Sequence, residues 1–375
     1  MFEKVLILSA SVGAGHLRAA QAIEKAFKEL NAARQIDNVD TLEYTNKLFQ
    51  NLYSKAYIEL VNKAPHVLGL LYDHFDKPWH NERHRLAFEK LNTRPLIKMI
   101  EQYQPDIVVC THFLPAEIIA ELRAKKRLKT RQVITVTDFD AHAMWLCRHC
   151  EHYFVALDET KVHLSQLGIP ADNITVSGIP IDPVFAQQKS KAKMRQKYGL
   201  APSIPTILVS AGGFGVGPIE HLIRAMVKMN NRVQVVVICG RNEQLKKRVH
   251  DFSKDLPRDC PIRILPVGYT TEMDEYMTAA DLMLGKPGGL TTSEALAKGL
   301  GFIIVNPIPG QEDRNADHLL ENGAAIRCNN LPVLAYKIDK LLGDPKRLTA
   351  MQANAHTLGR PHSAYEVVKK TLSLL

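Results

Sequence analysis

The stretch "AADLMLGKPGGLTTSEALAKG", residues 279–299, decides how the rest of the chain is interpreted. It opens as a short apolar strand, turns on Gly288 and Gly289, and continues into a run of good helix formers. Three hydroxyl side chains lie at or near the predicted start of this helix: Thr291, Thr292 and Ser293. The N–H groups and dipole of such a helix start favour an anion such as a diphosphate. Helix capping is the alternative role for the hydroxyls.

The same order of strand, glycine turn and helix occurs twice more. "VLILSASVGAGHLRAAQAI" places Gly13 and Gly15 between a strand and an amphipathic helix, and "TILVSAGGFGVGP" does the same with Gly212 and Gly213. Glycine also serves ordinary tight turns, so each turn has a purely structural alternative. None of the three fits the dinucleotide or P-loop fingerprint, which weighs against a dehydrogenase or an NTPase.

Short apolar strands alternate with helices in both halves of the chain, which predicts an α/β fold with two doubly wound parallel sheets. A length of 375 residues also favours two domains. Such domains bind ligands in a cleft at the carboxyl ends of their strands. The predicted organisation is a first domain at 1–186 with a helical, basic and aromatic insert at 42–103, a basic linker at 187–200, a second domain at 201–358, and a C-terminal helix at 359–375 that crosses back.

Composition is typical of a soluble globular protein, with 46% hydrophobic and 23% charged residues. No apolar run reaches the roughly 18 residues of a membrane span. The N-terminus enters "KVLILSA" at once, without the features of a secretory signal, so we expect a cytoplasmic protein. Cys147 and Cys150 form a CxxC near two histidines, but no second ligand pair is apparent, so we predict reduced thiols and no metal.

The net charge of +9 favours polyanions, anionic membrane surfaces or phosphorylated ligands. No helix-turn-helix, RNP or zinc-finger pattern is present, so we predict no nucleic-acid partner. Between Tyr44 and Ile100, nine Lys and Arg residues outnumber five Asp and Glu residues and are interleaved with aromatics. This favours peripheral docking on an anionic bilayer. A helical cover with a solvated basic face is the alternative.

Four candidate proton-handling residues follow predicted strand ends or turns. His16 closes the first glycine turn, and an imidazole there can act as a general base toward a hydroxyl. Asp138, in "VTDFDAHAMW", either orients that histidine or is itself the base. His112 and His142 are further candidates near the expected cleft.

The loop "PIPGQEDRNADHLLENG", residues 307–323, presents Gln311 and Glu312 on a segment stiffened by proline. Amide and carboxylate side chains on a stiff loop suit recognition of a hydroxyl-rich ring, although an ordinary polar loop would look similar. Glu294, in the predicted first turn of the earlier helix, is stabilised by the helix dipole. Its carboxylate can equally accept hydrogen bonds from a sugar diol.

Taken together, these motifs resemble the monogalactosyldiacylglycerol synthase and processive diacylglycerol glucosyltransferase family, of the family 28 type. The likeness covers most of the chain, and it rests on "SASVGAGHLRAAQAI", "VTDFDAHAMW", "VSGIPIDPVF", "SAGGFGVGPI", "KPGGLTTSEALAKGLGFIIV" and "PIPGQEDRNA". The resemblance implies a GT-B fold, in which two Rossmann-like domains face a central cleft.

The resemblance also implies site roles. His16 and Asp138 match the family's catalytic positions, and the second domain would bind a UDP-sugar as donor substrate without a cofactor. The implied donor contacts are Gly212 and Gly213 near the phosphates, Val267 and Gly268 by the uracil, Thr291, Thr292 and Ser293 on the diphosphate, Glu294 on the ribose, and Gln311 and Glu312 on the sugar.

We therefore expect an inverting glycosyltransferase, peripheral on the inner face of the cell membrane, that transfers a hexose from a UDP-sugar to a lipid acceptor, with diacylglycerol as the expected acceptor. One alternative keeps the fold and changes the chemistry to that of a UDP-N-acetylglucosamine 2-epimerase. Another is a non-catalytic nucleotide-sugar sensor.

Overall fold

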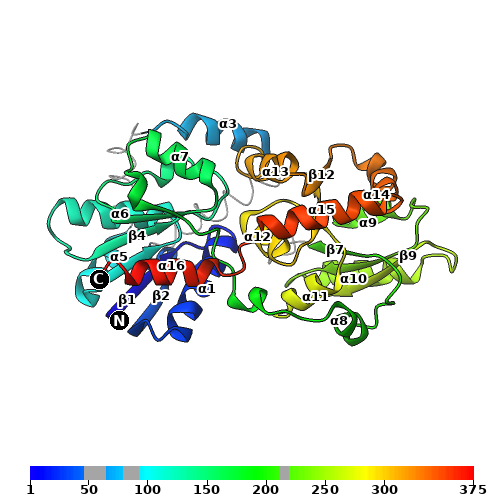
Figure 1. Ribbon diagram of the computed structural model, residues 1–375, viewed down its shortest axis with the longest axis horizontal. Helices are drawn as coiled ribbons and strands as arrows, with labels where there is room; N and C mark the ends of the chain where they lie inside the picture. Colours follow the sequence, from blue (N-terminus) through cyan, green and yellow to red (C-terminus); the bar gives the residue numbers. More distant parts are fainter. Residues whose placement is uncertain (46–64, 79–92, 211–218) are drawn as a thin grey trace.

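The computed structural model describes residues 1–45, 65–78, 93–210 and 219–375. Two parallel sheets of six strands each form its centre (Figure 1). The first sheet has the order β2-β1-β3-β4-β5-β6 and contains β1 (Phe2–Ser9), β2 (Ala33–Asp40), β3 (Ile107–Cys110), β4 (Arg131–Thr135), β5 (His152–Val155) and β6 (Ile174–Val176). The second has the order β12-β11-β10-β7-β8-β9 and contains β7 (Thr206–Ser210), β8 (Val233–Ile238), β9 (Ile262–Val267), β10 (Leu282–Gly285), β11 (Gly301–Val305) and β12 (Ala325–Cys328).

Helices cover both sheets. The first domain carries α1 (Gly15–Glu29), α3 (Pro65–Phe75), α5 (Arg94–Tyr103), α6 (Phe113–Ala124) and α7 (Asp158–Gln166), with the short helices η1 (Thr41–Tyr44), η2 (Ala143–Trp145), η3 (Ala171–Asn173) and η4 (Pro183–Ala186). The second carries α8 (Lys191–Lys197), α9 (Ile219–Met226), α10 (Glu243–Lys254), α11 (Met273–Ala279), α12 (Gly289–Ala297), α13 (Gln311–Glu321), η5 (Leu331–Val333), α14 (Leu334–Leu342) and α15 (Pro345–Leu358). The last helix is α16 (Ser363–Leu372).

Strand β1 shows why the run at residues 5–8 is continuously apolar. Leu6 and Leu8 pack in one buried cluster with residues of α5 and α6. Val5 and Ile7 point the other way and pack with residues of α1 and α16. Because helices cover both faces of a parallel sheet, successive side chains of a central strand are all buried.

The end of the chain returns to the first domain. Helix α16, red in Figure 1, lies beside α1. Val367 and Val368 are buried with Ile23 and Phe27 of α1, and the Tyr365 hydroxyl donates to the Glu29 carboxylate. The crossing segment passes close to α12, since a Cβ at Gly359 would lie 2.6 Å from the Leu296 carbonyl oxygen.

Much of the basic, aromatic insert predicted at 42–103 lies outside the described residues. The part that is described contains η1, α3 and α5, with α3 and α13 side by side (Figure 1). A Cβ at Gly69 of α3 would lie 2.9 Å from the Pro309 side chain, and one at Gly310 would lie 2.8 Å from the Tyr72 ring. Helix α3 therefore packs directly against the loop that leads into α13 of the second domain.

Among the described residues, no helix has the length and apolar character required to span a membrane. All six cysteines, including Cys147 and Cys150, are free thiols.

Candidate active site between the two domains

The first domain positions His16 at the start of α1, directly after the turn that contains Gly13 and Gly15. Gly13 has a φ of 88°, a left-handed conformation that favours glycine. His16 Nδ1 lies 3.0 Å from the Thr111 carbonyl oxygen and 2.8 Å from Thr137 Oγ1. Because a carbonyl oxygen only accepts, Nδ1 carries the proton and Nε2 keeps its lone pair. The ring is thus held as the tautomer that a general base requires.

Burial keeps the His16 imidazole neutral. It lowers the pKa of His16 to about 4, against an opposing effect of the Thr111 hydrogen bond. His112 packs edge-on against His16, with ring centroids 4.6 Å apart. His112 Nδ1 accepts a hydrogen bond from the Leu114 N–H at the start of α6, and burial, with a smaller contribution from His16, holds the pKa of His112 well below its usual value. His112 therefore supports the base structurally.

Asp138 lies next to Thr137 but faces the second domain. Gln311 Nε2, at the start of α13, donates to Asp138 Oδ1 at 2.7 Å. Burial raises the pKa of Asp138 to about 6, the Gln311 bond opposes this rise, and nearby Asp140 adds to it. Thr111 and Thr137, rather than Asp138, orient the His16 ring. The structure thus joins Asp138 with Gln311, a residue predicted to contact the donor sugar.

Glu312, the next residue along α13, turns back onto its own loop. Its Oε2 accepts a hydrogen bond of 2.6 Å from the Ile308 N–H. Burial raises the pKa of Glu312 to about 7, and this backbone bond and Lys286 oppose the rise. Its Oε1 would lie 3.5 Å from a Cβ at Gly288, so the carboxyl group sits beside the start of α12.

Helix α12 begins close to the hydroxyl residues, as the sequence predicts. Its N-cap is Gly288 and its first residue is Gly289, so the hydroxyl residues fall within the helix. Thr292 is fully buried, and Ser293 Oγ donates to the Gly289 carbonyl oxygen at 2.9 Å. Thr291 is the partly exposed member of the three.

Gly289 has a clear physical reason to be glycine. A Cβ at this position would lie 2.3 Å from the Thr137 carbonyl oxygen of the first domain. The start of α12 therefore abuts the residue whose hydroxyl contacts His16. A Cβ at Gly15 would also lie 3.7 Å from Leu290, so both glycine turns meet at this point.

Glu294 is buried in α12 and forms an ion pair across the interface. Arg18 Nη2, on α1, donates to Glu294 Oε1 at 2.6 Å. Burial raises the pKa of Glu294, and the Arg18 guanidinium opposes that rise. The carboxylate predicted to bind ribose thus contacts the helix that carries His16.

Two further predicted donor contacts, Val267 and Gly268, lie at the end of an edge strand. Val267 is the last residue of the edge strand β9 and Gly268 follows it, and a Cβ at Gly268 would lie 3.4 Å from both Glu243 and Lys246 of α10. Gly212 and Gly213 lie outside the described residues. His142 Nε2 lies 2.8 Å from the Tyr72 carbonyl oxygen, so His142 links η2 to α3.

Several residues of the interface carry roles that sequence reasoning missed. Asn315 Oδ1 accepts from the Phe139 N–H at 3.1 Å, and its Nδ2 donates to the Pro287 carbonyl oxygen at 3.0 Å, which joins the two domains. Arg314 donates to Asp140 and Asp76 at 2.7 Å each. A signal was available for Arg18, because a cation in the first turn of a helix is disfavoured by the helix dipole unless it is paired.

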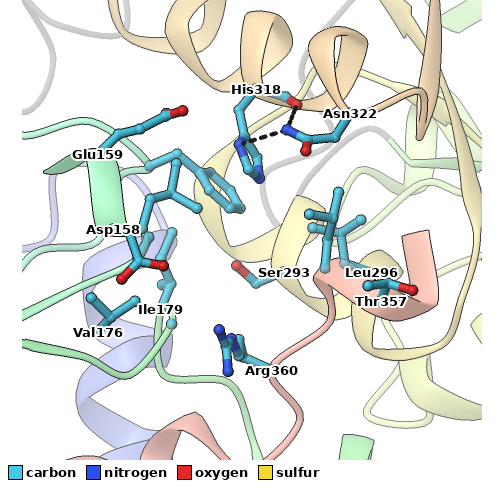
Figure 2. Close-up of a pocket in the computed structure, with 15 residues that line it drawn as sticks. Asp158, Glu159, Val176, Ile179, Ser293, Leu296, His318, Asn322, Thr357 and Arg360 are labelled. Atoms are coloured by element: carbon cyan, nitrogen blue, oxygen red, sulfur yellow. Dashed lines mark hydrogen bonds between the residues drawn. The ribbon is translucent and has the colours of Figure 1, made fainter. Parts of the chain in front are cut away.

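A separate pocket of about 230 Å³ lies between the domains (Figure 2). The first domain contributes Asp158 and Ile179, the second contributes Ser293 and His318, and Arg360 comes from the segment that crosses back. His16, Asp138 and Gln311 do not line it. This pocket is therefore distinct from the cluster around His16.

The cluster combines two features that a group-transfer reaction to a hydroxyl requires: a base and a site for an anionic leaving group. A neutral imidazole with a lone pair lies in the first domain, and the N-termini of α12 and α13 approach it from the second. A helix N-terminus favours an anionic group such as a leaving diphosphate. A general base next to such a site is suited to activating a hydroxyl nucleophile.

Comparison with known proteins assigns both halves of the chain to a family. The sequence model of the monogalactosyldiacylglycerol (MGDG) synthase family matches residues 16–181, and that of the glycosyltransferase family 28 C-terminal domain matches residues 206–368. The chain is 30% identical over 363 residues to a processive diacylglycerol beta-glucosyltransferase of Bacillus licheniformis, covering 96% of this chain and 92% of that protein.

Solved structures confirm the predicted GT-B fold. Acinetobacter baumannii MurG has a TM-score of 0.65 at 18% identity, with 100% of both chains covered. Anabaena HepE in complex with UDP-glucose has a TM-score of 0.57 at 15% identity, again with 100% of both chains covered. The family models and the Bacillus relative go further than the fold: this chain belongs to the family of monogalactosyldiacylglycerol synthases and processive diacylglycerol glucosyltransferases.

Proposed function

We propose that this chain is an inverting glycosyltransferase that transfers a hexose from a UDP-sugar to the hydroxyl of diacylglycerol. The observation that carries the proposal is the His16 ring, which is neutral, holds its Nδ1 proton toward Thr111, and leaves the Nε2 lone pair for a substrate hydroxyl. The family relationship supports the donor and acceptor classes.

The proposed reaction is a single displacement. His16 Nε2 takes the proton from the lipid hydroxyl as its oxygen bonds to C1 of the sugar. The bond between C1 and the diphosphate oxygen breaks, and its electron pair leaves with UDP. Backbone N–H groups at the start of α12 stabilise the departing diphosphate, so the proposal includes no metal or other cofactor. Gln311 and Glu312 contact the sugar. Asp138 of the first domain supports this contact through its hydrogen bond to Gln311.

The test uses the purified protein with UDP-glucose, UDP-galactose and UDP-N-acetylglucosamine, each against vesicles that contain diacylglycerol or another lipid alcohol. We expect UDP release that requires both a donor and diacylglycerol. No UDP release with any pair of substrates would refute the proposal.

The epimerase alternative has less support, because the Bacillus relative at 30% identity is a glucosyltransferase. Epimerised sugar formed without any acceptor would favour it. The sensor alternative predicts UDP binding without turnover, unchanged by His16→Ala and Asp138→Asn.

We further propose that the enzyme acts as a peripheral protein on the anionic inner face of the cell membrane. Val67 and Leu70 of α3 are 46% and 72% exposed, and they lie one turn apart. An exposed apolar pair within a basic segment is suited to docking on an anionic bilayer.

Vesicle flotation tests this membrane proposal. We expect stronger binding to phosphatidylglycerol vesicles than to phosphatidylcholine vesicles, and weaker binding for Val67→Ser/Leu70→Ser. Tyr336→Ser is the control, since Tyr336 is 65% exposed on α14 of the second domain. Equal binding to both kinds of vesicle by all variants would count against membrane docking.

A further inference from the structure

Arg18 occupies an unusual position for a cation. It lies in the first turn of α1, which contains no acidic residue. The positive end of the helix dipole disfavours a cation there. Its guanidinium instead contacts Glu294 Oε1 of the other domain at 2.6 Å, so the second domain supplies the compensating charge.

The two partners differ in their dependence on this contact. The Glu294 side chain is 2% exposed, whereas that of Arg18 is 41% exposed. Arg18 can therefore be hydrated without Glu294, but a buried carboxylate that loses its cation is left uncompensated. Asp182 and Asp274 face Glu294 as well and raise its pKa further, so Arg18 is the group that keeps this carboxylate ionised.

We propose that Arg18 is a positioning residue for the donor, which holds Glu294 ionised and fixes its orientation for the ribose of the UDP-sugar. This inference rests on the proposed function. Among the described residues, Oε1 is bound by Arg18 and Oε2 has no hydrogen-bond partner. Oε2 is thus left to accept from a ribose hydroxyl while Arg18 retains Oε1.

The position of Arg18 also couples donor binding to the base. His16 lies two residues earlier on the same helix, and a Cβ at Gly15 would lie 3.7 Å from Leu290 of α12. A donor that engages Glu294 therefore meets a carboxylate already tied to the helix of His16. Binding of the UDP-sugar would hold the two domains in the arrangement that brings the base to the sugar.

The test is a double-mutant cycle of Arg18→Met and Glu294→Gln, with Arg18→Lys as the conservative variant. Kinetics for the UDP-sugar are measured at saturating lipid, and UDP affinity is measured separately by calorimetry. We expect Arg18→Met to raise KM for the donor about tenfold with a smaller change in kcat, because the charge-assisted contact that holds the Glu294 carboxylate is lost. Arg18→Lys restores part of the affinity, and the double variant resembles either single variant.

Lys25→Met is the matched control. Lys25 also lies on α1, but its ammonium group pairs with Asp182 at 2.7 Å and Arg18 is the residue that pairs with Glu294. A second readout is pH: in Arg18→Met the pKa of Glu294 should rise further because the opposing cation is lost, so KM for the donor should fall as pH rises, and this trend should vanish in the double variant.

Two results would overturn the inference: a donor KM for Arg18→Met that matches that of Lys25→Met, or additive effects of Arg18→Met and Glu294→Gln. If Arg18→Met does not fold, Arg18→Lys and the double variant carry the test. Absence of turnover in the wild-type protein would refute the proposed function instead, and the calorimetric UDP affinities would still decide the role of Arg18.

Discussion

His16 is set apart from an ordinary buried histidine by the two groups that contact its Nδ1. The Thr111 carbonyl oxygen and Thr137 Oγ1 fix which nitrogen carries the proton. The position of His16 after a glycine turn predicts it as a candidate base. A sequence does not show which backbone carbonyl a side chain will contact. Thr137 precedes the predicted Asp138, yet its role depends on how closely β4 approaches α1 in the fold. The sequence predicts His16 as a candidate base but does not predict the two threonines that contact its ring.

Replacing His16 tests whether its imidazole is the general base. We expect His16→Gln to lower kcat by about 10²–10⁴-fold, the usual contribution of a general base, while the protein stays folded. Turnover of the UDP-sugar with diacylglycerol and the thermal midpoint are the measurements. His250→Gln, an exposed residue of α10, is the control and should behave as the wild type. Retained turnover in His16→Gln would remove His16 as the base.

The raised pKa of Asp138 should make the free energy of unfolding depend on pH. Its pKa is raised from 3.8 to about 6, so the folded protein binds a proton that the unfolded chain releases between these values. Wild-type stability is therefore lost as pH rises through this window. We expect Asp138→Asn to increase the free energy of unfolding at pH 7.5 by about 1–3 kcal/mol, with little gain at pH 3.5. Equal stability of the two proteins at pH 7.5, measured by chemical denaturation, would contradict the expectation.

Helix α12 shows what a pattern of elements can and cannot predict. The strand, the glycine turn and the following helix were all expected, and β10 and α12 are present. The hydroxyl residues lie at the start of the helix, as predicted, but the sequence does not predict the close approach of Gly289 to Thr137 of the other domain. No local signal in the chain reports such an interdomain contact.

Neighbouring glycines give a direct test of that contact. A methyl group at Gly289 would clash with the Thr137 carbonyl oxygen at 2.3 Å, whereas one at Gly288 would make an ordinary contact of 3.5 Å with Glu312 Oε1. Gly288 also has a φ of −66°, which alanine adopts readily. We expect Gly289→Ala to destabilise the protein by about 1–3 kcal/mol and Gly288→Ala to cost much less. Equal thermal midpoints for the two variants would show that the contact is unimportant.

At the scale of the whole molecule, ion pairs and hydrogen bonds join the domains at several points. The sequence predicted two domains and a cleft, but which charged residues meet across it depends on the relative placement of the domains. Arg314 is an example: it reaches Asp140 of the first domain and Asp76, just after α3. It also lies over the Tyr72 ring, with its guanidinium carbon 5.2 Å from the ring centroid. Helix α3 is thus tied to the donor domain.

We expect Arg314→Met to loosen α3 and to raise KM for the lipid acceptor about threefold or more, with a smaller effect on the donor. Hydrogen exchange of α3 and acceptor kinetics are the measurements. Arg327→Met is the matched control, because Arg327 pairs with Asp313 of α13 within the second domain, at 2.8 Å. If both variants change α3 exchange equally, Arg314 does not link α3 to the donor domain.

The proposed reaction is a single displacement, in which a hydroxyl activated by the first domain attacks a donor bound by the second. The configuration of the product tests it most directly. With UDP-glucose, whose anomeric carbon is α, and diacylglycerol in vesicles, proton NMR of the purified lipid should show a β-glucoside, formed together with one UDP per sugar transferred. An α-glucoside, or sugar released or epimerised without transfer to the lipid, would contradict the account.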